Sequence, residues 1–478
     1  METYSPYRTA LERALAHSLT HLDALDGTSV AATATLEELR ARLARSLDFE
    51  GIPAEDVLDD LVADMAGGIL GSAGGRFFGW VIGGAVPAAL AADWLTAAWD
   101  QNAASYACAP AEAVIEEVAG AWLKDLLGLP PTASVAFVSG TQMAHVTALA
   151  SARHRLLAQH GWNVERQGLM GAPVLCILSS QERHGSIERA VRLLGLGSDS
   201  VIDLPVDDQG RLQADTLSHA LQAVAQQPVI VILQAGDLNI GAYDPFADLI
   251  PLAHAAGAWV HVDGAFGLWA AASPTYRHLL AGVEAADSWA TDGHKWLNVP
   301  YDAGYVFVAD QEAHRSAMAY VAPYTLRHAQ VREPADWNPE WSRRGRGIAT
   351  YAALRHLGRR GIAALIERTC QQAQTLVRQI GALDGVDILW EPQINQGLVR
   401  FRDSTPGATD LAHDRRTEQV MAAIQRTGEA FFSGTTWCGK RCMRVSVCNW
   451  QTSERDIKRA VAAVQSVLHA ASHETTLE

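Results

Sequence analysis

Residues 258–267 read AWVHVDGAFG, an apolar run that ends in a carboxylate and small residues. Such a run is typical of a strand buried on both faces, as in a parallel sheet covered by helices. Ligand sites in open α/β sheets lie at the carboxyl ends of the strands, which is where Asp263 stands. We expect its carboxylate either to cap a loop or to face a cation in a site. Gly264 and Ala265 leave room there for a flat ligand.

A metal ion is a weaker interpretation of the same strand. His261 and Asp263 are two residues apart, so they would lie on one face of the strand. No third ligand lies nearby in the sequence, whereas a catalytic zinc ion takes three protein ligands. We therefore predict no metal site.

The segments on either side of this strand alternate between short apolar runs and helical patterns. Strands are expected at residues 134–139, 174–178, 229–233 and 304–308, and helices at 111–127, 141–160, 185–194 and 248–256. This alternation predicts an α/β fold, in which a mostly parallel sheet lies between two layers of helices. We assign this three-layer large domain to residues 96–360.

The chain before and after the large domain has different patterns. Residues 1–66 are helical and amphipathic, and we expect an N-terminal helical segment over residues 1–95. The remainder, residues 361–478, is expected to form a small C-terminal α+β domain. Its expected elements are helices at 361–380 and 453–472 and strands at 386–389, 397–401 and 443–448.

The composition excludes several classes of protein. Of the 478 residues, 49% are hydrophobic and 19% charged, which excludes long disorder as the main feature. The net charge of −15 argues against a nucleic-acid binder and against a polybasic membrane-surface protein. The cysteines are sparse, the N-terminus lacks the apolar core of a signal peptide, and the most apolar stretch, 82–99, is interrupted by Pro87 and Asp93. We expect a cytoplasmic protein with free thiols and no membrane span.

Residues 137–145 read FVSGTQMAH and predict a strand, a glycine turn and the start of a helix at Thr141. The first turn of a helix offers free N–H groups and the positive end of the helix dipole, so it can bind a phosphate. Turns of this kind are common. The motif alone is therefore a weak indication of phosphate binding.

Residues 290–304 read ATDGHKWLNVPYDAG and place Lys295 in an apolar and aromatic setting. Two interpretations are open for this lysine. It is either a surface residue whose stem packs on Trp296, or a buried amine that acts as a nucleophile toward an aldehyde.

Taken together, these motifs suggest pyridoxal 5'-phosphate (PLP). The helix start at Thr141 would hold the phosphate, Asp263 would keep the pyridine nitrogen protonated, and Lys295 would hold the aldehyde as a Schiff base. His184, in SSQERHGSIERA, follows an expected strand and precedes a helix. It would either stack on the cofactor ring or be an ordinary loop histidine.

The chain resembles the group II PLP-dependent amino-acid decarboxylases of fold type I, which include aromatic-L-amino-acid, histidine and glutamate decarboxylases. The matching segments occur in the family order. They are GRFFGW (75–80), SGTQMAHVTALASAR (139–153), RHGSIERA (183–190), GAYDPF (241–246), HVDGAFG (261–267), YRHLLAGVEAADSWATDGHKWL (276–297) and MRVSVCNWQT (443–452). The combination of HVDxA with HKWL at this spacing is highly specific. The resemblance implies a fold type I enzyme that uses PLP.

The resemblance also implies roles for individual residues. Lys295 corresponds to the Schiff-base lysine, Asp263 to the partner of the pyridine nitrogen, Ala265 to the small residue against the ring, and His184 to the histidine stacked over it. The positions that correspond to phosphate contacts are Gly140, Thr141, Gln142, Asp292 and His294. The positions that correspond to substrate contacts are Trp80, Val81 and Gly83 on the pocket wall and Arg444 at the α-carboxylate.

The phosphate turn departs from the family pattern SGGTEAN. Met143 and His145 stand where the family has polar residues. Asp292 places an acid near the phosphate dianion, which is unfavourable unless its carboxylate is paired.

The implied activity is the α-decarboxylation of an L-amino acid to its amine and CO2, carried out by a homodimer whose N-terminal segment wraps its partner. The aromatic residues near Trp80 favour an aromatic or other apolar substrate, whereas the arginines of SRRGR (342–346) would suit an acidic one. In aromatic-amino-acid decarboxylase a tyrosine of a mobile loop protonates Cα, but the matching residues 331–346 contain no tyrosine. Tyr320 and Tyr324 lie earlier and would have to substitute.

Several alternatives stay open. Loss of the loop tyrosine goes with decarboxylation-dependent oxidative deamination, which gives an aldehyde, although the retained His184 favours the amine. Another fold type I activity, an aldolase or carbon–carbon lyase, would keep Lys295 and Asp263 but would not explain the Arg444 motif. A non-catalytic PLP-binding scaffold is disfavoured because Lys295, Asp263 and His184 are all retained.

Overall fold

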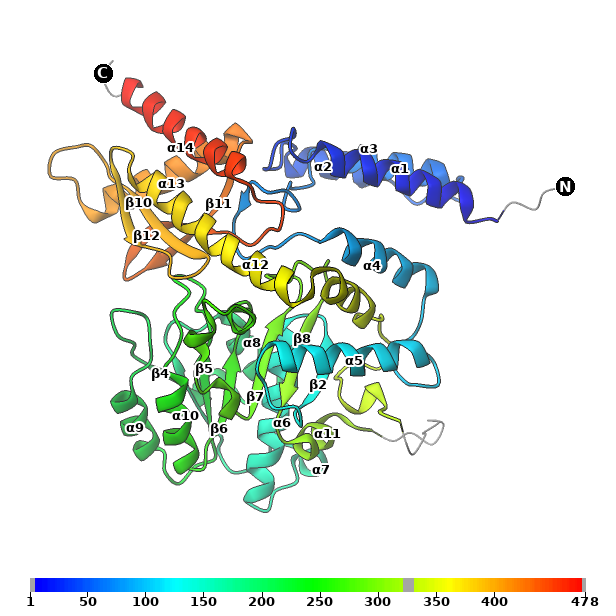
Figure 1. Ribbon diagram of the computed structural model, residues 1–478, viewed down its shortest axis with the longest axis vertical. Helices are drawn as coiled ribbons and strands as arrows, with labels where there is room; N and C mark the ends of the chain where they lie inside the picture. Colours follow the sequence, from blue (N-terminus) through cyan, green and yellow to red (C-terminus); the bar gives the residue numbers. More distant parts are fainter. Residues whose placement is uncertain (1–4, 321–330, 475–478) are drawn as a thin grey trace. The chain divides into compact units, whose positions relative to one another are not determined.

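The computed structural model describes residues 5–320 and 331–474, which form two compact units. The large unit comprises Gly83–Gln374 and Pro392–Gly397. The terminal unit comprises the described residues up to Ile82, Thr375–Glu391 and the described residues from Leu398 onward. Figure 1 colours the chain along its sequence, with the terminal unit in blue and in orange to red. The domain limits expected from the sequence stay predictions.

The large unit is built on a seven-stranded sheet in the order β2-β8-β7-β6-β5-β3-β4. The strands are β2 (Ser134–Val138), β3 (Cys176–Ser180), β4 (Val201–Leu204), β5 (Val229–Gln234), β6 (Trp259–Asp263), β7 (Ser288–Asp292) and β8 (Gly304–Val308). Neighbouring strands pair in parallel except at β8, which is antiparallel to both β2 and β7. The prediction of a mostly parallel α/β sheet is confirmed.

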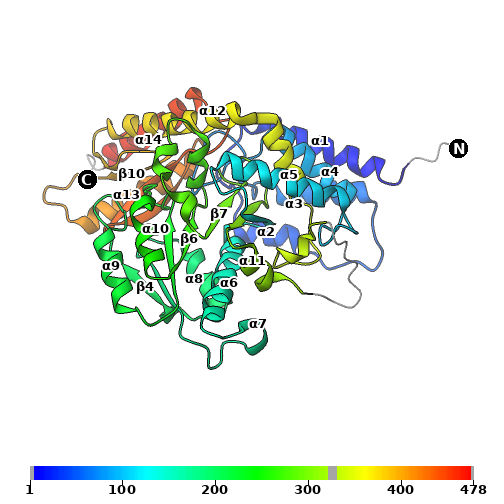
Figure 2. The same ribbon diagram turned by 60° about the horizontal axis from the view of Figure 1, so that its bottom comes forward.

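Helices cover both faces of this sheet (Figure 1, Figure 2). The large unit contains the helices α4 (Pro87–Trp99), α5 (Pro110–Leu126), α6 (Thr141–Gln159), α7 (Val164–Gln167), α8 (Gly185–Leu193), α9 (Ala214–Ala223), α10 (Phe246–Ala255) and α11 (Gln311–Met318), with 3₁₀ turns η1 (Ser198–Ser200), η2 (Gly267–Ala272), η3 (Arg277–Leu280), η4 (Val283–Ala285) and η5 (Pro334–Asp336). The helices α6 and α8 pack side by side on one face of the sheet, and α9 and α10 pack side by side on the other. Every residue of β2, β5, β6, β7 and β8 is buried, as expected for strands covered on both sides.

The strand β7 was not expected from the sequence, because its residues, SWATD, are partly polar. Its buried polar groups find partners inside the fold. The Ser288 hydroxyl, for example, accepts a hydrogen bond from the indole nitrogen of Trp259 on β6 at 2.9 Å. Burial of a hydrogen-bonded polar group costs little, so the strand stays in the core.

The terminal unit contains a five-stranded sheet in the order β1-β11-β12-β10-β9. Its strands are β1 (Phe77–Phe78), β9 (Val386–Trp390), β10 (Gln396–Phe401, whose first residues belong to the large unit), β11 (Phe431–Trp437) and β12 (Lys440–Ser446), and its helices are α1 (Arg8–Ala24), α2 (Leu36–Leu43), α3 (Ala54–Met65), α13 (Asp410–Thr427) and α14 (Glu454–Glu474). The short strand β1 pairs in parallel with β11. This pairing joins the N-terminal chain to the C-terminal α+β elements.

The helix α12 (Gly347–Gly381) begins well before the helix expected at residue 361. Two helical stretches meet at Gly358, whose φ of 59° lies in the left-handed region. Glycine adopts this region without the steric cost that a Cβ would impose, which permits the break.

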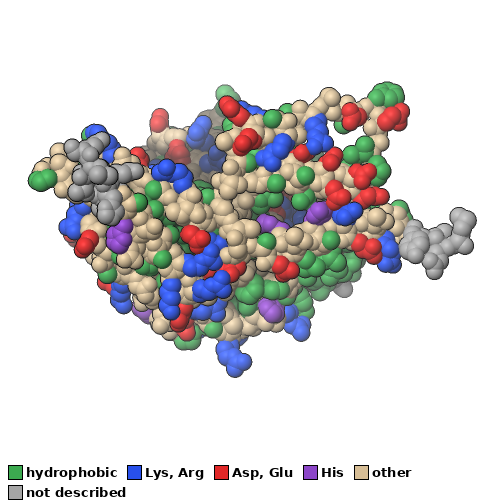
Figure 3. Space-filling model, turned by 90° about the horizontal axis from the view of Figure 1, so that it is seen from above, with side chains coloured by type: hydrophobic (Ala, Val, Ile, Leu, Met, Phe, Trp, Pro, Cys, Tyr) green, Lys and Arg blue, Asp and Glu red, His purple; other side chains and the backbone are tan. Residues whose placement is uncertain are grey.

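Basic and acidic side chains are interspersed on the face of the molecule seen in Figure 3. Within residues 5–320 and 331–474, no helix is long and apolar enough to cross a bilayer. The same residues contain no group of three or more His, Cys, Asp or Glu side chains placed to hold a metal ion.

Candidate active site

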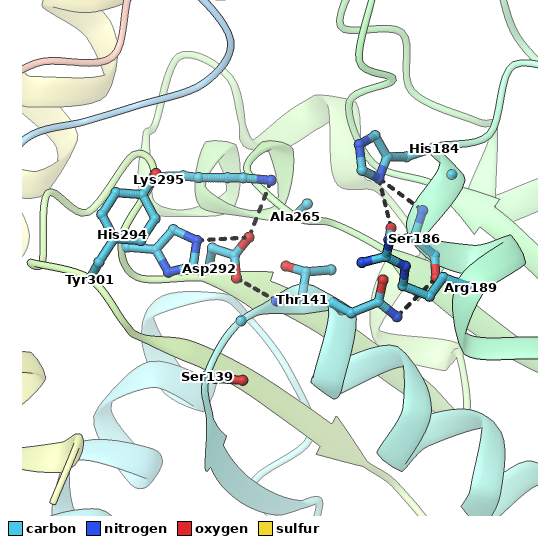
Figure 4. Close-up of a pocket in the computed structure, with 13 residues that line it drawn as sticks. Ser139, Thr141, His184, Ser186, Arg189, Ala265, Asp292, His294, Lys295 and Tyr301 are labelled. Carbon is cyan, nitrogen blue, oxygen red and sulfur yellow. Dashed lines mark hydrogen bonds and ion pairs between the residues drawn. The ribbon is translucent and has the colours of Figure 1, made fainter. Parts of the chain in front are cut away.

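A cavity of about 660 Å³ opens in the large unit where β2, β6 and β7 end (Figure 4). Its walls come from the turn into α6, the start of α8, and the segments that follow β6 and β7. The lining residues are Ser139, Gly140, Thr141, Gln142, His184, Gly185, Ser186, Arg189, Ala265, Asp292, His294, Lys295 and Tyr301. The carboxyl ends of parallel strands meet at one edge of a sheet, which explains why segments so far apart in sequence converge here.

The helix α6 begins at this cavity with Thr141. The hydroxyl oxygen Oγ1 of Thr141 is buried and has no hydrogen-bond partner among the described residues. The backbone N–H of Thr141 donates to Oδ1 of Asp292 at 2.6 Å, and Nε2 of Gln142 donates to the carbonyl of Ser186 at 3.2 Å. A helix start with an unsatisfied hydroxyl suits an anion such as a phosphate.

Asp292 is paired within the site. Its Oδ2 lies 3.2 Å from Nζ of Lys295 and 3.6 Å from Nε2 of His294. Burial lowers the pKa of His294, and Lys295 lowers it further, against the opposing effect of Asp292. The acid that was expected to oppose a phosphate is thus compensated by a lysine and by the start of α6.

Lys295 points into the cavity, with 24% of its side chain exposed (Figure 4). The next residue, Trp296, is fully buried, and its indole nitrogen donates to the Thr369 hydroxyl at 2.8 Å. Gly83 packs against the lysine backbone, because a Cβ at this position would lie only 1.9 Å from the Lys295 carbonyl oxygen. These contacts fix the backbone from which the amine extends.

Asp263 ends β6 and is 6% exposed, and its Oδ1 accepts a hydrogen bond from the backbone N–H of Ala265 at 3.2 Å. Burial opposes the charged form of this carboxyl. The nearby His145, His184 and Lys295 outweigh that effect, and the pKa of Asp263 is held well below its usual range. The site therefore contains a carboxylate that stays ionised although it is buried.

His184 is the N-cap residue of α8. Its Nδ1 lies 3.1 Å from the backbone N of Ser186 and 2.7 Å from the Ser186 hydroxyl. A backbone N–H can only donate, so Nδ1 is the acceptor and the neutral ring carries its proton on Nε2. His184 thus caps a helix and also lines the cavity, and its stacking on a cofactor ring stays a prediction.

Sequence reasoning missed two lining residues with useful chemistry. The ring of Tyr301 stacks on His294, with centroids 4.4 Å apart. Arg189 lines the cavity from α8 and makes no hydrogen bond or ion pair with any described residue. Both lie inside motifs that were recognised, RHGSIERA and NVPYDAG, but spacing alone does not say which side chains face a cavity.

The predicted substrate residues do not all belong to one unit. Gly83 lies in the large unit, whereas Trp80, Val81 and Arg444 lie in the terminal unit. There, the backbone N–H of Trp80 donates to the Ser433 hydroxyl at 3.1 Å, and Ser433 pairs with the buried Arg444 across β11 and β12.

The segment SRRGR is occupied by ion pairs in the large unit. Arg343 binds both carboxylate oxygens of Glu116 at 2.7 and 3.0 Å, and Arg344 and Arg346 pair with Asp93 and Asp302. An arginine held in this way is poorly placed to anchor a substrate.

The two tyrosines that would replace the loop tyrosine are placed differently. The ring of Tyr320 lies 6.2 Å from that of Trp341, and Tyr320 is not a lining residue of the cavity. Tyr324 lies outside the described residues.

Comparisons with known proteins agree with this geometry. The family model described as "Pyridoxal-dependent decarboxylase conserved domain" matches residues 37–403. The chain is 24% identical to an aromatic-L-amino-acid decarboxylase of Bacillus atrophaeus over 95% of this chain and 93% of that protein. It is 32% identical to an aspartate 1-decarboxylase of Aliivibrio fischeri over 63% of this chain, a match that spans 59% of that protein's length.

A solved structure shares the fold. The crystal structure of Oryza sativa TDC with PLP and tryptamine superposes with a TM-score of 0.92 and 22% identity, covering 98% of this chain and 99% of that one. The residues around the cavity fit PLP, since an amine, a small Ala265 and an unsatisfied Thr141 hydroxyl at a helix start line it. The ionised Asp263 is not itself a lining residue, but it lies close enough to Lys295 for the two charges to interact. The chain belongs to the pyridoxal-dependent decarboxylase family and is a PLP-dependent amino-acid decarboxylase.

Proposed function

We propose that this enzyme removes the α-carboxylate of an L-amino acid with an aromatic or other apolar side chain, giving the amine and CO2. The observation that carries the proposal is the convergence of Lys295, His184 and the start of α6 on one cavity. In this assignment Lys295 Nζ binds the cofactor aldehyde, and Ala265 packs against the ring. The phosphate contacts come from Gly140, Thr141, Gln142, Asp292 and His294.

PLP, when bound, takes up the electron pair left at Cα as the bond to the carboxylate breaks. Asp263 serves this chemistry by staying ionised, so that it pairs with a protonated ring nitrogen. His184 presents Nε2–H, because its Nδ1 is engaged by Ser186. The protein thus orients the reacting groups and fixes the charge around them.

The product depends on how a proton reaches Cα after CO2 has left. Residues 331–346 carry no tyrosine, which would favour oxidation to an aldehyde. The phenol of Tyr301 in the cavity and the retained His184 favour protonation, and hence the amine. Decarboxylation with oxidative deamination to the aldehyde is the alternative product.

The substrate class rests on aromatic groups near the predicted contacts. In the large unit Tyr301 and His294 form a stacked pair in the cavity wall. In the terminal unit Trp80 packs on Phe431, with ring centroids 5.3 Å apart. We assign Trp80, Val81 and Gly83 to the substrate pocket and Arg444 to the α-carboxylate.

An acidic amino acid is the second candidate substrate, and one residue favours it. Arg189 is a cation of the cavity wall that no described carboxylate neutralises, so it could bind a side-chain carboxylate. One relative is an aspartate 1-decarboxylase. An aldolase or carbon–carbon lyase activity is the remaining alternative, since it would use the same lysine and carboxylate.

We also propose a homodimer. No residue of α1, α2 or α3 is buried. Leu11, Leu15 and Leu19 lie four residues apart on α1 and are 59%, 43% and 50% exposed, so they form an apolar stripe that a second copy would cover. Light scattering should give twice the chain mass. The combined substitution Leu15→Glu and Leu19→Glu should shift it toward the monomer, and a fully active wild-type monomer would contradict the proposal.

A cytoplasmic location is proposed on the state of the cysteines. All six are thiols rather than disulfides in the structure, as is usual in a reducing compartment.

The function is tested by product mass spectrometry. The wild-type enzyme, with PLP added, is incubated in air with aromatic, aliphatic and acidic L-amino acids, and Lys295→Ala serves as the control. An amine lighter than its substrate by CO2, formed fastest from an aromatic or aliphatic amino acid, supports the proposal. An aldehyde would establish the oxidative alternative, and a preference for aspartate or glutamate that is lost in Arg189→Gln would establish the acidic one.

A further inference from the structure

Behind Asp263 lies a row of buried polar side chains that the proposed mechanism does not use. Trp259, His261 and Asp263 alternate along β6 and so share one face of the strand. His145 comes from α6 and Ser288 from β7. These five side chains are all buried, and the histidines and Ser288 completely so.

Hydrogen bonds connect four of these side chains in a line, which ends close to the fifth, Asp263. The indole nitrogen Nε1 of Trp259 lies 2.9 Å from Ser288 Oγ, and Ser288 Oγ lies 2.9 Å from His261 Nδ1. His261 Nε2 lies 2.9 Å from His145 Nδ1. His145 Nε2 faces Asp263 Oδ2 at 3.5 Å.

The direction of the bonds in this line is set at its Asp263 end, because an ionised carboxylate only accepts. The Nε2 atom of His145 faces this carboxylate, so the neutral ring carries its proton there and its Nδ1 accepts. His261 then donates from Nε2 to Nδ1 of His145, and its own Nδ1 accepts the proton of the Ser288 hydroxyl. The Ser288 oxygen in turn accepts from the indole N–H of Trp259, which can only donate.

Burial keeps the inner histidine neutral, as this arrangement requires. Burial and the neighbouring His145 lower the pKa of His261 to about 3. The Nε2 atom of His145 is buried and makes no hydrogen bond with any described residue, and the carboxylate that it faces, at 3.5 Å, is that of Asp263. The hydrogen-bond donors of this line are therefore all oriented toward the carboxylate of Asp263.

We propose that His145 and His261 are positioning residues, which act through a one-way relay from Trp259 to keep Asp263 ionised and oriented toward the ring nitrogen of PLP. The relay rests on the proposed pairing of Asp263 with that nitrogen. The relay assigns a role to His145, which departs from the family pattern. It also assigns a role to His261, which had suggested a metal site. Its effect should be specific to the ring nitrogen, because the phosphate and aldehyde contacts are made by other residues.

The test compares two cofactors on the full chain. The protein is freed of cofactor and titrated with PLP and with the PLP analogue in which a C–H group replaces the ring nitrogen, and each Kd is measured by quenching of tryptophan fluorescence. His145→Phe removes both ring nitrogens, and Ser288→Ala interrupts the far end with a smaller change. The matched control is His314→Phe. His314 is also completely buried, but it bonds to Ser134 and to the Trp337 carbonyl, outside the relay.

We expect His145→Phe to raise the Kd for PLP about tenfold or more and Ser288→Ala about threefold, as for the loss of a hydrogen bond to a charged group. The Kd for the analogue should stay within about twofold in both variants, and the control should treat both cofactors alike. Equal weakening for the two cofactors, or no weakening for PLP, would overturn the relay.

A different result would point to the underlying assignment. If the wild type binds PLP and its analogue equally well, the pairing of Asp263 with the ring nitrogen is wrong, and the relay is overturned with it. Borohydride labelling of Lys295 in the presence of PLP reports separately on whether the cofactor site itself is correct.

Discussion

Replacing Glu112 with glutamine is expected to stabilise the protein in alkaline solution and to change little in acid. Glu112 lies on α5 and is 2% exposed. Its Oε1 accepts the backbone N–H of Gly347 at 2.8 Å, but its Oε2 is buried and has no hydrogen-bond partner among the described residues. Burial, together with the nearby Glu116, raises the pKa of Glu112 to about 8.

The direction in which the free energy of unfolding changes with pH follows from proton linkage. The folded-state pKa lies above the unfolded value of 4.5, so the folded state holds one more proton between these two values. The free energy of unfolding therefore falls as pH rises from about 4.5 to about 8 and then levels off. At about 1.4 kcal/mol per pKa unit, the cost reaches at most ~5 kcal/mol. Glutamine resembles the protonated acid and avoids this cost.

The measurement is urea unfolding of the wild type and of Glu112→Gln at a series of pH values from about 4 to about 9. Glu116→Gln is the matched contrast, since Glu116 lies one turn further along α5 and pairs with Arg343 through both oxygens. Loss of that charge leaves a buried arginine unpaired and should cost about 3–5 kcal/mol at neutral pH. Parallel pH profiles for the wild type and Glu112→Gln would refute the reasoning.

Three further predictions concern the cavity. Lys295→Ala should abolish both turnover and the visible absorbance of bound PLP, because the described residues that line the cavity include no other lysine; retained absorbance that borohydride fixes to the chain would contradict this. Gly83→Ala should lower PLP occupancy and the unfolding midpoint together, because its Cβ would overlap the Lys295 carbonyl; unchanged occupancy by absorbance titration would show that the backbone can shift freely. Tyr301→Phe should slow amine formation by about 10²-fold and raise the aldehyde fraction if the phenol supplies the proton, as loss of a general acid does, and a product ratio equal to that of the wild type would remove Tyr301 from this role.

The fold was predictable because it depends on short-range patterns. The strand β6 and the helix α6 are apolar enough, and bounded clearly enough by glycine, to be located from the sequence. The strand β7 was not, because its buried polar groups are satisfied by partners that only the folded chain provides. The early start of α12 was also missed. A glycine such as Gly358 usually marks the end of a helix, whereas here a second helical stretch continues beyond it.

The candidate site was predictable in its members and less so in its contacts. The residues expected around the cofactor aldehyde and phosphate line one cavity, because all of them follow strands of the same sheet. What spacing could not give was the pairing of side chains far apart in sequence. The contact of His145 with His261 joins residues 116 positions apart, and Asp292 reaches the start of α6 across 151 positions.

Asp292 has a consequence for how a phosphate would enter the site. Its carboxylate already holds the backbone N–H of Thr141 and faces Lys295, so the chain carries its own anion at the start of α6. Binding of the cofactor then replaces one anion by another. The Asp292 carboxylate has to give up its contact with Lys295, and it has to share the N–H groups at the start of α6 with the phosphate. The contacts of Asp292 hold the turn in shape before a phosphate binds. The affinity for phosphate is then set by the difference in free energy between the phosphate contacts and the Asp292 contacts that they replace.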